Sequence, residues 1–94
     1  MNIGMAIKLA RKSIGVSQKY LSNITGYSTS HISLIESNRR DPSISTLETL
    51  AYALELPVGV LLFLSFDKND LHGLEESCIK NLSKLALELI KQGK

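Results

Sequence analysis

Side chains with hydroxyl groups are concentrated in one short stretch, residues 28–37, and Arg39 and Arg40 follow closely. Hydroxyls donate and accept hydrogen bonds, and guanidinium groups pair well with phosphate oxygens. His31 and His72 have no cysteine or carboxylate partner at the spacing of metal ligands, and the six glycines are too dispersed for a phosphate-binding loop. The chain therefore favours binding of a polar, anionic ligand, and we predict no catalytic residue, no metal site and no cofactor.

Two short helices separated by a glycine are predicted to position these hydroxyls. The first covers Ser17–Thr25, and the second lies within Tyr27–Asn38. Ser17 and Ser28 can each accept a backbone N–H from the first turn of the helix that they begin. Gly26 permits the positive φ that a tight turn between two crossed helices needs.

Apolar spacing predicts how these two helices pack together. Leu21 and Ile24 form the inward face of the first helix. Ile32 and Ile35 lie three residues apart on one face of the second helix. A small residue is needed where the helices cross, and Ser22 occupies that position.

Together these features resemble the lambda Cro and repressor-type helix-turn-helix family, also called the XRE family. The resemblance extends over roughly Ile3 to Leu64, about two-thirds of the chain. It includes the segments Leu9-Ala10-Arg11, Gly15-Val16-Ser17-Gln18, Ile32-Ser33-Leu34-Ile35-Glu36 and Arg39-Arg40-Asp41-Pro42-Ser43. The chain departs from the family at Ser22, where alanine is usual, and at Asn38, where glycine is frequent, although asparagine also tolerates a left-handed backbone. The resemblance implies a sequence-specific transcriptional regulator, of the repressor or controller type, that binds double-stranded DNA.

The motif match also implies roles for individual residues. The expected base-reading positions are Ser28, Thr29, Ser30, His31, Ser33, Leu34 and Ser37. The expected phosphate contacts are Gln18, Lys19, Asn38, Arg39 and Arg40. Arg11 and Glu36 match a structural salt bridge that is common in the family. Other interpretations stay open: the serines cap helices with or without DNA, and the two arginines can be a solvated loop pair.

Further helices are predicted on both sides of the pair. One spans about Asn2 to Ser13, and Gly15 ends it. Another starts at Ser43 or at Ser45, where Ser45–Glu48 offers a capping box. The inward positions of these two helices are Ile3, Ala6, Ile7, Ala10, Ile14, Leu47, Leu50, Ala51 and Leu54.

The rest of the chain predicts two more helices and no strand. Pro57 suits the first turn of a short helix that ends at Phe63 or Leu64. A helix of about 20 residues follows the polar residues 67–70. The expected fold is therefore all-α: a five-helix lambda-repressor-like DNA-binding domain at residues 1–66, and an additional amphipathic helix at residues 67–94.

The last two helices carry more apolar surface than so small a core should need. Large exposed apolar patches commonly mark interfaces, so we expect a homodimer. The predicted interface residues are Val60, Leu61, Phe63, Leu64, Phe66, Leu74, Cys78, Leu82, Leu85 and Leu89. Two-fold symmetry would place two reading helices about 34 Å apart over an inverted repeat. Alternatively, the last helix packs back across its own subunit.

Charge and composition agree with a DNA-binding protein. Residues 1–45 hold six basic and two acidic residues, whereas residues 46–94 hold five basic and seven acidic residues, so the basic half contains the motif. The single cysteine, Cys78, excludes an internal disulfide, and the apolar run Val58–Phe66 is far shorter than the about 20 residues that span a bilayer. We expect a cytoplasmic, nucleoid-associated protein with no membrane partner. The rival interpretation is a protein-interaction module, or an antitoxin-like protein, that uses the same fold to bind a partner protein.

Overall fold

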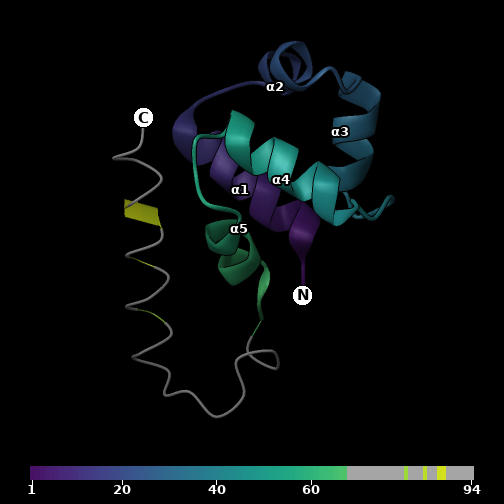
Figure 1. Ribbon diagram of the computed structural model, residues 1–94. Helices are drawn as coiled ribbons and strands as arrows, with labels where there is room; N and C mark the ends of the chain where they lie inside the picture. The colour runs from purple at the N-terminus through teal and green to yellow at the C-terminus, as the bar shows by residue number, and fades with distance from the viewer. Residues whose placement is uncertain (68–79, 81–83, 85–86, 89–94) are drawn as a thin grey trace.

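The computed structural model describes residues 1–67 and residues 80, 84, 87 and 88 (Figure 1). Residues 1–67 form the helices α1 (Ile3–Ile14), α2 (Gln18–Thr25), α3 (Thr29–Glu36), α4 (Ile44–Ala53) and α5 (Val58–Ser65). This part of the chain contains no strand, which confirms the predicted all-α class. Most of the predicted helix at residues 67–94, including Leu74, Cys78, Leu82, Leu85 and Leu89, lies outside the described residues.

The start and end of α1 follow from its sequence. The side-chain oxygen of Asn2 accepts a hydrogen bond from the backbone N–H of Met5, at 2.9 Å, and so caps the helix. Gly15 ends it in the left-handed conformation, with φ 87°. The helix begins and ends one residue later than predicted. Its inner stripe is confirmed, because Ala6, Ile7 and Ala10 are buried and Ile3 and Ile14 pack against the core.

The helix pair α2 and α3 closely matches the prediction. Ser17 accepts from the N–H of Tyr20 and Ser28 from that of His31, at 2.9 and 3.0 Å. Gly26 adopts φ 83° between the two helices. The core residues of the pair are Leu21, Ile32 and Ile35.

The inward position predicted for Ile24 is wrong, because half of this side chain is exposed. Thr25, one turn beyond Leu21, takes the inward place instead. Its hydroxyl donates to the carbonyl oxygen of Leu21 at 2.7 Å and accepts from the N–H of Tyr27 at 3.2 Å. This hydroxyl satisfies backbone groups at the end of α2, which an isoleucine side chain cannot do.

Helix α4 begins at the earlier of its two predicted starts. Ser43 accepts from the N–H of Thr46 at 3.1 Å, so Ser45 lies inside the helix and the capping box predicted there is wrong. Leu47, Leu50, Ala51 and Leu54 are buried, as predicted. Among the described residues no single helix is both long and apolar enough to cross a membrane; α4 and α5 reach that length only together, with a bend of 109° between them.

The core lies between α1 and the helices around it. Helix α1 packs against α3 and α5, α2 packs against α3 and α4, and α4 also contacts α5. In Figure 1, α1 and α4 cross the centre of the domain, with α2 and α3 on one side and α5 on the other. Helix α1 therefore supports α3, and α4 supports α2.

Helix α5 exposes less apolar surface than predicted. Leu61 and Leu64 are buried in the core of their own subunit and are not available to a partner. They belong to the core because α5 packs against both α1 and α4. Val60, Phe63 and Phe66 are partly buried. Leu87 also packs, partly buried, against this core.

Candidate nucleic-acid interface

The outer face of α3 presents the predicted base-reading side chains to solvent. Ser28, the N-cap residue, is exposed, and so are Thr29, Ser30, Ser33, Leu34 and Ser37. The last five recur at the spacing of one helical face, because positions four residues apart lie one turn above each other. Ile32 and Ile35 point the opposite way into the core. The sequence therefore separates the two faces of α3 cleanly into a buried apolar side and an exposed side made mostly of hydroxyls.

His31 is placed differently from the hydroxyl residues. Its ring lies against the ring of Tyr27, with centroids 5.0 Å apart and planes at 67°, an edge-to-face arrangement. The side chain is partly buried. Packing on Tyr27 gives His31 a structural role at the start of α3, in addition to the base-reading role predicted for it.

A buried polar network ties α3 to α1 and α2. Glu36, at the end of α3, receives Arg11 Nε at 2.7 Å on Oε2 and Arg11 Nη2 at 3.1 Å on Oε1. Gln18, in the first turn of α2, donates from Nε2 to Glu36 Oε1 at 3.0 Å. Arg11 Nη1 also donates to the carbonyl oxygen of Val16 at 3.0 Å. The salt bridge implied by the resemblance is thus present, and Gln18 braces α3 through the same carboxylate.

Basic residues lie before and after α3 in the chain. Lys19 is exposed in the first turn of α2. Arg39 and Arg40 are exposed in the turn that follows α3, and the N–H groups of both donate to the carbonyl oxygen of Leu34, at 2.9 and 3.2 Å. These two bonds cap the end of α3 and fix the backbone from which the arginine side chains project.

The side chain of Asn38 forms hydrogen bonds with residues at the beginning of α1. Its Oδ1 accepts from the N–H of Gly4 at 3.0 Å, and its Nδ2 donates to Asn2 Oδ1 at 2.7 Å. Sequence reasoning identified Asn38 as a left-handed residue, which φ 61° confirms, but missed these contacts. The sequence signal for these contacts was the asparagine itself, at a position where the family frequently has glycine. An amide side chain has both the acceptor that Gly4 needs and the donor that Asn2 needs.

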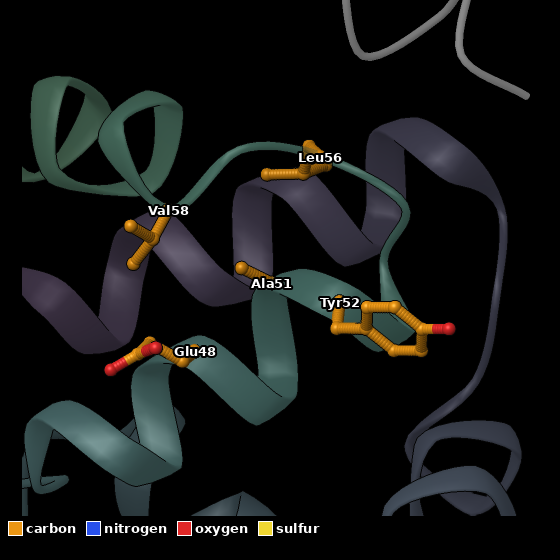
Figure 2. Close-up of a pocket in the computed structure, with 5 residues that line it drawn as sticks. All are labelled: Glu48, Ala51, Tyr52, Leu56 and Val58. Atoms are coloured by element: carbon orange, nitrogen blue, oxygen red, sulfur yellow. The ribbon is translucent and has the colours of Figure 1, made fainter.

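A small open pocket lies away from these residues, between α4 and the loop that leads to α5. It has a volume of about 230 Å³ and is lined by Glu48, Ala51, Tyr52, Leu56 and Val58. Figure 2 shows the Tyr52 ring and the Glu48 carboxylate extending in opposite directions from α4. No predicted DNA-contacting residue lines this pocket. Within the described part of the chain, no cluster of three or more His, Cys, Asp or Glu side chains could hold a metal ion.

Comparison with known proteins agrees with this geometry. The helix-turn-helix family model matches residues 7–61, more than half of the chain. The chain is also similar to the immunity repressor protein of Bacillus phage phi105, with 37% identity over 62 residues. The aligned region covers 66% of this chain and 43% of the phage protein, so the chain spans less than half of that relative's length. No solved structure matches the chain. From the family match and the arrangement of α2 and α3, the chain belongs to the XRE-type helix-turn-helix family.

Proposed function

We propose that the protein is a sequence-specific transcriptional regulator, of the repressor or controller type, that places α3 in the major groove of double-stranded DNA. The observation that carries the proposal is the outer face of α3, where hydroxyl side chains are exposed and the opposite face is anchored by Ile32 and Ile35. A major groove about 12 Å wide admits one α-helix. The similarity to the phage immunity repressor supports repression as the direction of regulation.

The side chains on α3 favour modest direct readout of the base sequence. Serine and threonine hydroxyls can bond several different base edges, and Leu34 or the methyl group of Thr29 can touch thymine methyl groups. The outer face carries no arginine or glutamine that could grip one base through two hydrogen bonds. DNA shape and bridging water should therefore contribute a large share of the specificity.

Phosphate contacts would hold α3 in register on the duplex. The Gln18 side chain lies at the C-terminal end of α3, where it bonds Glu36, and Arg39 and Arg40 follow the same end in the chain, so donors and charges are available there. Contacts of this kind set affinity and orientation but carry little sequence information. They also make binding depend on salt, because each neutralised phosphate releases counterions.

We further propose that two copies bind an inverted repeat as a homodimer. Val60 and Phe63 on α5, with Phe66 directly after it, support this proposal, because they are apolar and only partly buried in one subunit. A two-fold axis would place the two α3 helices about 34 Å apart, one turn of DNA. Sedimentation equilibrium at micromolar protein tests the assembly, and a single species of 10.3 kDa would overturn it.

An electrophoretic shift assay with DNA from upstream of the encoding gene tests the DNA-binding function. The proposal expects a shift at two salt concentrations that survives an excess of unrelated duplex. Equal competition by unrelated duplex would overturn sequence specificity. The absence of any shift at low salt would overturn DNA binding itself.

One observation favours a second candidate, a protein-interaction module. Ile44 and Tyr52 on α4 are 76% and 85% exposed, and neither lies on α3. Tyr52 also lines the pocket, and exposed apolar side chains suit a partner protein better than DNA. Failure of the shift assay, together with a stable complex with a co-expressed protein, would favour this candidate.

A further inference from the structure

We propose that Asn38 is a positioning residue for DNA binding, not a phosphate contact: its side-chain amide fastens the Arg39–Arg40 turn to the beginning of α1. This inference rests on the proposed DNA-binding function. It concerns a position where this chain carries asparagine and the family frequently carries glycine. The additional side chain gives the turn a connection that a glycine cannot make.

The hydrogen bonds around Asn38 leave one orientation for its amide. Oδ1 faces the N–H of Gly4, at 3.0 Å, so the NH₂ group faces Asn2 Oδ1, at 2.7 Å. Asn2 Oδ1 also accepts from the N–H of Met5, at 2.9 Å, so this oxygen is an acceptor for both. If the amide of Asn38 were reversed, its NH₂ group would face the N–H of Gly4 and its oxygen would face Asn2 Oδ1, and neither contact would be a hydrogen bond. The three hydrogen bonds are therefore consistent with a single orientation of both asparagine side chains.

The absence of a side chain at Gly4 is what lets Asn38 come so close. A Cβ atom at Gly4 would overlap the carbonyl oxygen of Ile35 and lie 2.7 Å from both Asn38 Oδ1 and the carbonyl oxygen of Glu36. The first turn of α1 therefore meets the last turn of α3 through backbone atoms. This close approach brings the N–H of Gly4 within reach of Asn38.

The backbone at Asn38 and its side chain act separately on the same turn. The N–H of Asn38 donates to the carbonyl oxygen of Ile35 at 3.0 Å, and the φ of 61° at Asn38 then directs the chain so that the N–H groups of Arg39 and Arg40 donate to Leu34. Glycine at this position would also allow that path. Only the amide attaches the turn to α1. Substitution by glycine therefore removes the attachment and keeps the turn.

The residue that holds Asn38 is itself fixed at two other points. The backbone N–H of Asn2 donates to the carbonyl oxygen of Ser65, at the end of α5, at 2.6 Å. Its side chain caps α1 through Met5. The turn is thus attached to a rigid position where α1 and α5 meet. Two arginines on a fixed backbone lose less conformational freedom when they bind phosphates than two arginines on a mobile one.

The test compares Asn38→Gly with the wild-type protein in DNA binding, at a temperature where circular dichroism shows both to be folded. We expect affinity for DNA to fall about three- to tenfold, the loss anticipated when side chains must be ordered on binding. The same substitution in an Arg39→Ala/Arg40→Ala background should cause no further loss. A merely structural role would lower affinity equally in both backgrounds, and that result would overturn the inference.

Substitutions at Asn2 provide a matched pair. Asn2→Ser keeps a capping hydroxyl for the N–H of Met5 but is too short to reach Asn38, and it should reproduce the loss seen with Asn38→Gly. Asn2→Asp keeps the acceptor for both donors and should bind like the wild type. Equal affinity of Asn2→Ser and Asn2→Asp would also overturn the inference.

Hydrogen exchange of the Gly4 amide separates this inference from the proposed function. Loss of the Asn38 acceptor should make this amide exchange faster in Asn38→Gly, with or without DNA. If the wild type binds no DNA, the proposed function fails, and the role in DNA binding fails with it. If the wild type binds DNA but Gly4 exchanges at the same rate in both proteins, only the inference fails.

Discussion

Arg11 and Glu36 form a bidentate ion pair that joins α1 to α3, with N–O distances of 2.7 and 3.1 Å. The two side chains are only 11% and 3% exposed. Glu36 also accepts from Gln18, and Arg11 also donates to Val16, so both charged groups have several partners. Such a pair matters most for stability when one member is removed, because the other charge then stays buried without compensation.

Arg11→Met should lower the free energy of unfolding by about 3–5 kcal/mol, because the carboxylate of Glu36 would lose its counter-charge. Urea denaturation followed by circular dichroism measures the change. The double variant Arg11→Met/Glu36→Leu removes both charges and should recover most of the stability. A double variant as unstable as Arg11→Met would contradict this account of the loss.

Ser43→Ala and Ser45→Ala test where α4 begins. Ser43 accepts from the N–H of Thr46 and caps the helix, so its replacement should cost about 1 kcal/mol of unfolding free energy. Ser45 lies inside α4, where alanine is the better helix former, so its replacement should cost nothing. Thermal unfolding of the two variants makes the comparison. Equal destabilisation would show that the helix starts elsewhere.

Gly4→Ala should destabilise the domain, because its Cβ would overlap the backbone oxygen of Ile35. Overpacking of this kind costs about 1–3 kcal/mol, which outweighs the roughly 1 kcal/mol that alanine gains over glycine in a helix. Gly59→Ala in α5 is the control, since a Cβ there has no atom within 4 Å, and it should be neutral or stabilising. Urea midpoints that move the same way in both variants would contradict the prediction.

Arg39→Ala/Arg40→Ala should weaken binding to every DNA sequence and flatten its salt dependence. Each lost phosphate contact should reduce the slope of log K against log salt by about 0.9. Fluorescence anisotropy at several salt concentrations gives this slope. Lys80→Ala/Lys84→Ala removes two exposed charges outside the matched region, residues 7–61, and should leave the slope unchanged. Similar slopes for the two double variants would argue against the phosphate assignment.

Thr29→Ala and Ser30→Ala should change which sites are preferred more than they change nonspecific affinity. A good bidentate pair with a base is worth about 1–3 kcal/mol of discrimination, and a single hydroxyl contact should contribute less. Selection of bound duplexes from a random pool, before and after substitution, measures the preference. Recovery of an identical consensus from all three proteins would mean that these two hydroxyls do not read bases.

The helix pair could be predicted from sequence because its signals are local. Ser17 and Ser28 cap helices within three residues of themselves, and Gly26 supplies a turn that depends on its own φ. The buried positions Ile32 and Ile35 follow from helical spacing alone. These features need no knowledge of the rest of the fold.

The errors arose where two nearby residues are both acceptable by sequence, or where a contact joins residues far apart in the chain. Ile24 and Thr25 both lie about one turn beyond Leu21, and the hydroxyl of Thr25 was needed to close the turn. Ser43 and Ser45 are both acceptable caps by sequence, and in the structure Ser43 caps the helix. The bond between Asn38 and Asn2 joins residues 36 positions apart, so no local pattern encodes it.

The serine-rich outer face of α3 also bears on how readily this domain could acquire a new target. In the proposed complex a hydroxyl would rotate to suit the base edge that it meets, so each such contact would restrict the base sequence less than a bidentate contact does. An arginine at Ser30 or Ser33 could form two hydrogen bonds with guanine, and a glutamine could form two with adenine. Both positions are exposed, so neither change would disturb the buried side of α3. If α3 reads DNA as proposed, such substitutions should give the domain a new preferred site.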